Sequence, residues 1–455
     1  MPHQPLKGLA PTPWAWRLGI GVAILLAMGL AYGLEGVVGA RGQAALGVFC
    51  FIGLVAMCSA NLRAVNWRTV ACGFALQLML AVLILKFQIG EVRPVYWVFD
   101  QIAQVIKKFL EFSNQGATFV FGKLADPVAM GAVLGEDNGF IFACAALPPI
   151  IFVSSFFTVL YHLGVLQAVV RFMARSMMFL MGTSGAETLS AAANVFMGQT
   201  EAPLIVKPYV VRMTQSELLA LMVGGMATIS GGLMAVYIKM IGDRADPVAI
   251  LATSVMAAPC GLYLSKLLLP ETEEPATRGE VKIEVERSHV NVIDAAAAGA
   301  SDGLSLALNV AAMLIAFLAL LALIDAVLQR LHPDLSLRQI FGTIFSPLAM
   351  LMGVGPADIP TVADLLGTKL AANEFVAFKK LTTDYRDVLS PRAFTLSAYA
   401  LTGFANFASI SIQLGGIGAM APSRRHDLAR LGLKALMVGF LATLTNAAIA
   451  GMLLD

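Results

Sequence analysis

Residues 182–209 read GTSGAETLSAAANVFMGQTEAPLIVKPY and residues 345–378 read FSPLAMLMGVGPADIPTVADLLGTKLAANEFVAF; these two stretches decide the fold. Each belongs to a segment that is apolar at both ends and rich in Gly, Pro and polar residues in the middle, so neither can be a simple spanning helix. Irregular backbone at membrane depth is tolerated only where protein or a water-filled cavity satisfies its polar groups. We therefore predict two re-entrant helical hairpins, over about residues 172–209 and 340–378.

The composition places these stretches in a membrane protein. The chain has 455 residues, of which 58% are hydrophobic and only 13% charged, and its mean hydropathy is +0.78. A soluble domain carries roughly 25% charged residues, so this chain cannot cover its surface with charge. A soluble enzyme, a nucleic-acid module and a disordered protein are excluded, and a net charge of +2 provides no basic face for a nucleic acid.

Several further segments are long and apolar enough to cross a bilayer, which takes about 20 residues of helix. We predict an all-α polytopic protein with about nine transmembrane helices in addition to the two hairpins. The predicted spans are residues 18–38, 44–60, 69–87, 140–163, 218–240, 248–269, 304–328, 394–414 and 433–454.

Each predicted hairpin is followed by a span that is itself interrupted. The interruptions read GGMATISGG at residues 224–232 and GFANFASIS at residues 403–411. A hairpin and a broken helix that occur twice, starting from opposite sides of the membrane, are typical of a secondary transporter built from inverted repeats. Polar kinks used only for helix packing would explain one such element, but they explain four matched elements poorly.

Two polar regions divide the chain further. Residues 97–112, WVFDQIAQVIKKFLEF, alternate apolar and charged residues at helical spacing, which indicates an interfacial amphipathic helix; a solvated loop helix would show the same pattern. Residues 271–287 form the longest charged connection. The predicted units are an extra N-terminal helix (1–43), scaffold helices (44–90), an interfacial region (91–135), a first transport repeat (136–270), a cytoplasmic charged loop (271–300), a scaffold helix (301–335) and a second transport repeat (336–455).

The distribution of Lys and Arg predicts the orientation, because cationic loops remain in the cytoplasm. A cytoplasmic N-terminus and a periplasmic C-terminus place most of the cationic loops inside. The inside residues are then Lys7, Arg17, Arg63, Arg68, Arg171, Arg175, Lys207, Arg212, Arg278, Lys282, Arg287, Arg424, Arg425 and Arg430. The exceptions, near a predicted outer loop, are Lys379, Lys380, Arg386 and Arg392.

Two carboxylates inside the apolar stretches are candidate functional residues, because a charge within the membrane is costly. Glu201 lies in GQTEAP, between the helix-breaking Gly198 and Pro203, and Glu374 follows Asn373 in the second hairpin. Carboxylates accept hydrogen bonds from hydroxyl and ring N–H groups and repel anions. A paired-carboxylate glycosidase is an alternative that lacks support, because no soluble domain is present to hold a glycan.

Neutral polar residues accompany the two carboxylates. Gln199 and Thr200 precede Glu201, and Asn406 and Ser409 lie three residues apart and so share a helix face beside Phe404. No arginine fork for a phosphate or carboxylate occurs in these elements. This set is suited to a neutral ligand that combines hydroxyl and amide-like groups, such as a sugar joined to a base.

A sodium site is a second expectation. Asn194 precedes the first hairpin's break, and Thr228 and Ile229 lie at the break of the following helix, where side-chain and freed carbonyl oxygens can bind a monovalent cation. Capping and hinge roles would explain Asn194 and Thr228 equally well. The five cysteines and five histidines show no metal-ligand spacing, and the cysteines lie in apolar stretches as packed small residues do.

At these residues the sequence resembles the concentrative nucleoside transporter family, specifically its bacterial sodium-coupled members. The matching motifs stand in the family's order: residues 182–208, MTQSEL (213–218), NVIDAA (291–296), GTKLAANEFVAF (367–378) and LTGFANFASI (401–410). The resemblance runs from about residue 44 to the end of the chain. It implies a homotrimer whose scaffold holds a mobile transport domain, and an elevator-like step that carries a nucleoside across the bilayer.

The resemblance also implies roles for individual residues. The base would be bound by Gln199, Thr200 and Glu201, with Leu233 nearby. The ribose would be bound by Glu374, Asn406 and Ser409, with Phe404 against the ligand. Sodium would be bound at Asn194, Met197, Thr228 and Ile229, with Met197 and Ile229 contributing backbone carbonyls.

Two features depart from the family pattern. The helix at residues 18–38 is additional to the shortest bacterial members, and Thr228 stands where a serine is expected. We expect a non-enzymatic symporter of the bacterial inner membrane that imports uridine and related nucleosides with sodium as the coupling ion. Proton coupling and a non-transporting membrane receptor on the same fold are the alternatives, and no nucleic-acid partner is expected.

Overall fold

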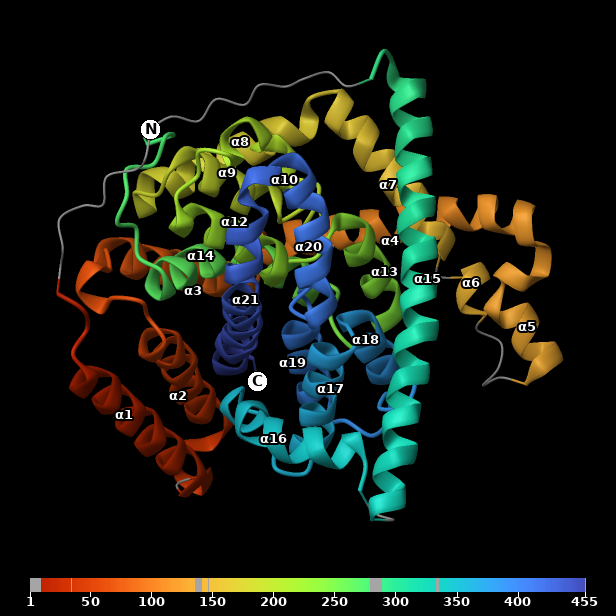
Figure 1. The fold of residues 1–455 in the computed structure, drawn as a ribbon. Coiled ribbons are helices and arrows are strands. Elements are labelled where there is room, and N and C mark those ends of the chain that lie inside the picture. The colour runs from red at the N-terminus through yellow and green to blue at the C-terminus, as the bar shows by residue number, and fades with distance from the viewer. Residues whose placement is uncertain are drawn as a thin grey trace.

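The computed structural model describes residues 10–33, 35–135, 141–145, 147–278, 289–332 and 335–454. These residues form helices joined by short connections, with no β-strand among them (Figure 1). Seven helices in this part of the chain are long and apolar enough to cross a membrane. Lys7, Lys282 and Arg287, which support the predicted orientation, lie outside the described residues.

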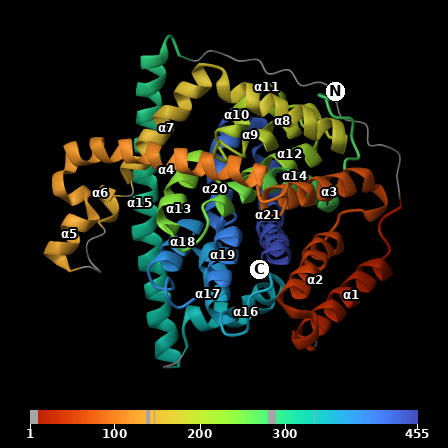
Figure 2. The same cartoon turned by 180° about the vertical axis from the view of Figure 1, so that it is seen from behind.

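Two of the predicted spans differ from simple crossings. Residues 304–328 lie inside a single 40-residue helix, α15 (Val292–Leu331), which runs the height of the molecule in Figures 1 and 2. Residues 394–414 are divided between α19 (Pro391–Leu401) and α20 (Phe407–Met420). The division of residues 394–414 into two helices was expected, because the sequence predicts an interruption at residues 403–411.

The N-terminal helices are α1 (Trp14–Gly33), α2 (Glu35–Met57) and α3 (Trp67–Leu85). The boundaries of the predicted first span, residues 18–38, are wrong. α1 begins at Trp14, four residues before the predicted start, and it ends at Gly33, before α2 begins at Glu35. Only 11% of the α1 span is buried. An exposed apolar surface of this kind suits contact with lipid.

The predicted interfacial segment, residues 97–112, lies within α4 (Pro94–Phe121), a 28-residue helix that crosses α15 in Figures 1 and 2. Two shorter helices follow, α5 (Pro127–Leu134) and α6 (Phe142–Ala145). Next, α7 (Leu147–His162) packs along α15 and also contacts α4.

The first repeat begins with α8 (Val165–Met181). Its hairpin consists of α9 (Gly185–Ala193), α10 (Ala202–Ile205) and α11 (Lys207–Val210). Its broken helix consists of α12 (Gln215–Ala227) and α13 (Gly231–Ile241), and α14 (Val248–Leu268) completes it.

The second repeat has the same order of elements. α16 (Leu337–Leu351) precedes a hairpin of α17 (Ile359–Ala371) and α18 (Glu374–Thr382). The broken helix α19–α20 follows, and α21 (Arg425–Leu453) completes it. Both predicted hairpins and both predicted interruptions are therefore present as breaks in helical structure.

Local capping chemistry explains where the helices restart after the breaks. Ser230, Asn373 and Asn406 are the N-cap residues of α13, α18 and α20, and the side chain of each accepts a hydrogen bond from a backbone N–H three residues later. Such caps satisfy N–H groups that the first turn leaves without a partner. These short polar residues thus stabilise helix ends inside an apolar protein.

The contacts between helices cross the boundaries of the predicted units. α2 and α3, in the predicted scaffold unit, pack on α21 and α14 respectively. α7, which falls within the predicted first transport repeat, packs along α15.

Hydrogen bonds gather the loops at two ends of the molecule. At one end, Ala60 N donates to Leu268 O (2.7 Å), and Arg424 donates to Met213 O (2.6 Å). At the other end, Arg392 donates to the carbonyl of Leu454 (2.9 Å). Arg424 and Leu454 flank opposite ends of the 29-residue helix α21.

Candidate functional site

The two broken helices and the first hairpin meet at their breaks. The amide of Phe404, between α19 and α20, donates to the carbonyl of Thr228, between α12 and α13, over 3.1 Å. The amide of Gly231 donates to Phe196 O, in the first hairpin, over 2.9 Å. Backbone groups freed by one break are thus satisfied at another, as buried backbone requires.

Glu374 is the centre of one polar cluster at this junction. Its carboxylate accepts hydrogen bonds from Asn406 Nδ2 (2.8 Å) and Tyr237 Oη (3.4 Å), and its side chain is almost fully buried. Glu374 is also the first residue of α18, where the helix dipole favours a negative charge. The second hairpin, α13 and α20 each contribute one residue, so the cluster depends on all three elements being in place.

A second cluster joins the first hairpin to α20. Gln199 Nε2 donates to Ser409 Oγ (3.2 Å), and Gln413 Nε2 donates to Gln199 Oε1 (3.3 Å). Thr200 packs against α20 at Gly416, where an added Cβ would come within 2.6 Å of the threonine methyl group. The structure therefore brings Gln199, Thr200 and Ser409 together, although Gln199 and Ser409 are 210 positions apart in the sequence.

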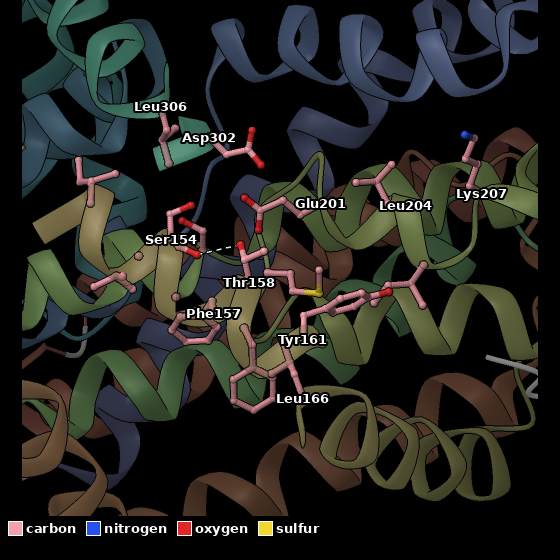
Figure 3. Close-up of a pocket in the computed structure, with 18 of the residues that line it drawn as sticks. Ser154, Phe157, Thr158, Tyr161, Leu166, Glu201, Leu204, Lys207, Asp302 and Leu306 are labelled. Atoms are coloured by element: carbon pink, nitrogen blue, oxygen red, sulfur yellow. Dashed lines mark hydrogen bonds between the residues drawn. The ribbon is translucent and has the colours of Figure 1, made fainter. Parts of the chain in front are cut away.

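Glu201 faces a different region from Gln199 and Thr200. One of its carboxylate oxygens accepts a hydrogen bond from Gly198 N at 3.0 Å, and its side chain lines a cavity of about 610 Å³. Figure 3 shows its carboxylate turned toward that of Asp302 on α15, with Ser154 and Thr158 of α7 beside them. Hairpin 1 contributes one wall of this cavity, and α7 and α15 contribute another.

The cavity and the Glu374 cluster are distinct regions. The cavity lining includes Met197 and Ser230 as well as Glu201, but it does not include Glu374, Asn406 or Ser409. The predicted base-binding residues are therefore divided: Gln199 and Thr200 face α20, whereas Glu201 faces the cavity. Leu233 and Phe404 are both buried.

Two of the predicted cation residues, Asn194 and Thr228, both lie beside Gly224 of α12. Asn194 is the C-cap of α9, and a Cβ added to Gly224 of α12 would lie 3.0 Å from its Nδ2 atom. Thr228 ends α12 and donates its hydroxyl hydrogen to Gly224 O at 2.8 Å. Asn194 Oδ1 is buried and has no hydrogen-bond partner within the described structure. An orphaned oxygen near the C-terminal carbonyls of a helix fits a monovalent cation.

Buried lysines anchor the first helix of each hairpin. Lys266 of α14 forms an ion pair with Glu187 of α9 at 2.6 Å. Lys369 of α17 donates to Ala400 O (2.7 Å) and Thr443 Oγ1 (2.9 Å), which ties the second hairpin to α19 and α21. These contacts are suited to holding the hairpins in place against α14, α19 and α21.

Several polar residues at these sites were not predicted, among them Tyr237, Asp302 and Gln413. A signal existed for two of them, because Tyr237 follows Leu233 by four residues and Gln413 follows Ser409 by four residues, which places each pair on one helix face. Asp302 carried no such signal, since its proximity to Glu201 depends on packing between distant helices.

Three family models match the chain. The model described as Na+ dependent nucleoside transporter N-terminus matches residues 46–124, and the model described as Na+ dependent nucleoside transporter C-terminus matches residues 249–451. Between them, residues 143–244 match a Gate model described as nucleoside recognition.

Relatives in other organisms match nearly the whole chain. An uncharacterized transporter of Haemophilus influenzae is 44% identical over 90% of this chain and 96% of its own length. Sodium/nucleoside cotransporter 1 of Mus musculus is 41% identical over 96% of this chain and 67% of its own length.

Solved structures show the same fold. CNTnw in an inward-facing substrate-bound state is 41% identical, with a TM-score of 0.85 over 90% of this chain and 97% of that chain. A doubly substituted CNTnw in an outward-facing state is 39% identical, with a TM-score of 0.84 over 92% of this chain and 98% of that chain.

Proposed function

Because this chain belongs to the family of concentrative, Na+-dependent nucleoside transporters, we propose that it imports uridine and related nucleosides by sodium symport with an elevator-type movement. Family membership makes the chain a membrane transporter and not an enzyme, as the sequence predicted. The observation that carries the proposal is the junction at which both hairpins contact α20, Gln199 through Ser409 and Glu374 through Asn406.

The chemistry of this junction suits a neutral nucleoside. Glu374 and Asn406 provide an acceptor and an amide beside one another, which suits the vicinal hydroxyl groups of a ribose. Gln199 and Thr200 provide amide and hydroxyl groups for the edge of a base. Since the residues that bind the two parts belong to different repeats, one ligand that contacts both would hold the hairpins together.

Sodium is the coupling ion in this proposal. The family is Na+-dependent, and the unpartnered Asn194 Oδ1 lies beside the end of α12. The carbonyls of Met197 and Ile229, with the hydroxyl oxygen of Thr228, would complete an oxygen-rich set. An ion there would join the first hairpin to the first broken helix, so sodium binding would organise the base-binding residues before the nucleoside arrives.

The elevator movement assigns different tasks to different helices. The hairpins and broken helices, which carry the proposed site, would move together, while α7 and α15 would remain in the scaffold of a homotrimer. The cavity between Glu201 and Asp302 lies where these two groups meet, so it would change shape during the movement. CNTnw in inward-facing and outward-facing states supports a large conformational change in such a protein.

We place the transporter in the bacterial inner membrane, with its N-terminus in the cytoplasm and its C-terminus in the periplasm. The end of the molecule that contains Arg63, Arg68 and Arg424 would face the cytoplasm, in agreement with the preference of cationic loops for that side. Arg392, at the opposite end, donates to backbone carbonyls of Gly353 and Leu454, so a structural role accounts for its presence there.

Uptake of uridine into proteoliposomes tests this function. The purified protein is reconstituted, and uptake is measured under an imposed sodium gradient, an imposed pH gradient and neither, with protein-free liposomes as the control. We expect saturable uptake that follows the sodium gradient. Uptake that follows only the pH gradient would overturn sodium coupling, and no saturable uptake of any nucleoside would favour the receptor alternative.

A further inference from the structure

Gln413 lies on α20, one helical turn beyond Ser409, and is completely buried. We propose that Gln413 is a positioning residue that sets the orientation of the Gln199 amide and thereby selects bases that present a carbonyl oxygen to it. This inference rests on the proposed function for the assignment of Gln199 to the base.

A backbone carbonyl fixes the orientation of the Gln413 amide. Gln413 Nε2 lies 3.0 Å from Met222 O on α12. A carbonyl oxygen can only accept, so the amide nitrogen of Gln413 must point toward Met222. If this amide were turned over, its oxygen would face the carbonyl oxygen and a buried hydrogen bond would be lost, which is costly.

The same nitrogen then determines the orientation of Gln199. Gln413 Nε2 also donates to Gln199 Oε1 at 3.3 Å. Because that contact requires an acceptor on Gln199, the amide nitrogen of Gln199 must lie on its other edge. There Gln199 Nε2 donates to Ser409 Oγ at 3.2 Å. A chain of donors therefore runs from Gln413 through Gln199 to Ser409, and it has one direction.

Close packing keeps this chain in place. A Cβ on Gly225 of α12 would lie 2.8 Å from both Gln199 Cβ and Gln413 Nε2. Only a residue without a side chain allows the two glutamines to approach α12 this closely. Gln413 Oε1 has no hydrogen-bond partner within the described structure, so this amide is held only through its nitrogen.

The chain has a consequence for recognition. The edge of the Gln199 amide that faces Ser409 is its N–H edge, and one of the two N–H groups is used by Ser409. The second N–H is available to the base, where it can donate to a carbonyl oxygen but not to an amino group. The hydroxyl of Ser409, which accepts from Gln199, keeps its own hydrogen for the ligand. A base with a carbonyl at this position is favoured over the amino analogue.

A double-mutant cycle on reconstituted transporter tests the proposal, with KM for uridine and for cytidine as the readout. Gln413→Met keeps the size of the side chain and removes the donor. We expect the preference for uridine over cytidine to fall by about tenfold, the usual scale for losing one buried hydrogen bond. In a Gln199→Ala background, the same substitution should leave the ratio unchanged, because Gln413 acts through Gln199.

Other results would overturn the proposal. Equal loss of uridine and cytidine uptake in Gln413→Met would mean that Gln413 has only a packing role. The same would follow if the effects of Gln413→Met and Gln199→Ala on the uridine preference multiplied in the double variant. If Gln413→Met does not fold, Gln199→Glu is the second variant: it still accepts from Gln413 but cannot donate to a carbonyl. It should lose uridine preference, and an unchanged ratio would contradict the proposed direction.

Failure of the proposed function is distinguishable from failure of this inference. Wild-type protein is measured in parallel for uptake and for stabilisation of thermal unfolding by each nucleoside, which reports binding without transport. Absence of both effects in the wild type refutes nucleoside recognition and, with it, the role of Gln413. Normal wild-type behaviour with an unchanged ratio in the variants refutes the role of Gln413 alone.

Discussion

The carboxylate of Glu374 has two hydrogen-bond donors from two other elements, and both bonds are buried. Replacing it by Gln would turn one acceptor oxygen into an NH₂ group that faces another donor. Hydrogen bonds to charged groups contribute roughly 1.5–3 kcal/mol each. Replacing one carboxylate oxygen of Glu374 by nitrogen would therefore remove one of these hydrogen bonds.

Glu374→Gln is expected to lower uridine uptake at limiting concentration by about tenfold to a hundredfold, which is the rate equivalent of one such hydrogen bond. The measurement is initial uptake of labelled uridine, normalised to the amount of folded protein by size-exclusion chromatography. Tyr237→Phe is the matched control, since it removes only the longer bond to Glu374 and should have a smaller effect. Wild-type uptake by Glu374→Gln would contradict the ribose assignment.

A second prediction at the residue scale concerns Asn194, the proposed sodium ligand. Asn194→Ala removes the unpartnered oxygen and should raise the sodium concentration for half-maximal uptake by about tenfold, the effect of losing roughly 1.4 kcal/mol of binding free energy. Ser190→Ala is the control, because Ser190 Oγ makes only a 3.5 Å contact with Asn194. An unchanged sodium dependence in Asn194→Ala would leave Asn194 as a helix cap.

At the scale of elements, glycine determines how closely the first broken helix approaches the hairpin. Gly225 lies on α12 where a Cβ would be 3.1 Å from Gln199 Cα as well as 2.8 Å from two side-chain atoms. Backbone cannot move aside as the end of a flexible side chain can. The close approach of α12 to the first hairpin therefore requires a glycine.

Gly225→Ala should force the first hairpin away from α12. The expected cost is about 1–3 kcal/mol of stability, the usual range for overpacking a core, together with weaker uridine binding. Thermal unfolding of the purified protein with and without uridine measures both effects. Gly232→Ala on α13 is the matched control, because its nearest non-local atom is 3.9 Å away. Equal melting temperatures for the two variants would refute the close-approach argument.

The predicted elements show which local signals were reliable. Clusters of Gly, Pro and polar residues inside apolar segments predicted both hairpins and both interruptions, since such clusters disfavour continuous helix. The exact restart points depend on capping residues such as Ser230 and Asn373. The end of the first span was wrong because apolar residues recur at Val37 and Val38 beyond Glu35, and hydropathy alone does not show where a helix stops.

At the scale of the whole molecule, the two ends carry different loops. Ser423 is an exposed residue in the connection between α20 and α21, and Asp387 is highly exposed near Arg244 at the other end. The proposed topology places these residues on opposite sides of the membrane. Surface ion pairs contribute little, so replacing Asp387 should not disturb the fold.

Labelling of single cysteines tests this arrangement. In a background with the five native cysteines replaced by Ala, Asp387→Cys should react with a membrane-impermeant maleimide in intact cells from which the outer membrane barrier has been removed. Ser423→Cys should react only after lysis of the inner membrane. Each variant serves as the control for the other, and the reverse pattern would invert the topology.

The amino-acid sequence by itself determined the membrane environment, the two hairpins, the two interruptions and most of the polar residues at the junction. These features follow from local composition and helix chemistry, which do not depend on distant contacts. Only the tertiary structure decided that Glu201 faces Asp302 while Gln199 faces Ser409, and that Gln413 orients Gln199. The packing of α7 along α15 is likewise evident only in the tertiary structure. The physical reason is that such contacts join residues on helices far apart in the chain, and local periodicity carries no information about which helix faces will meet.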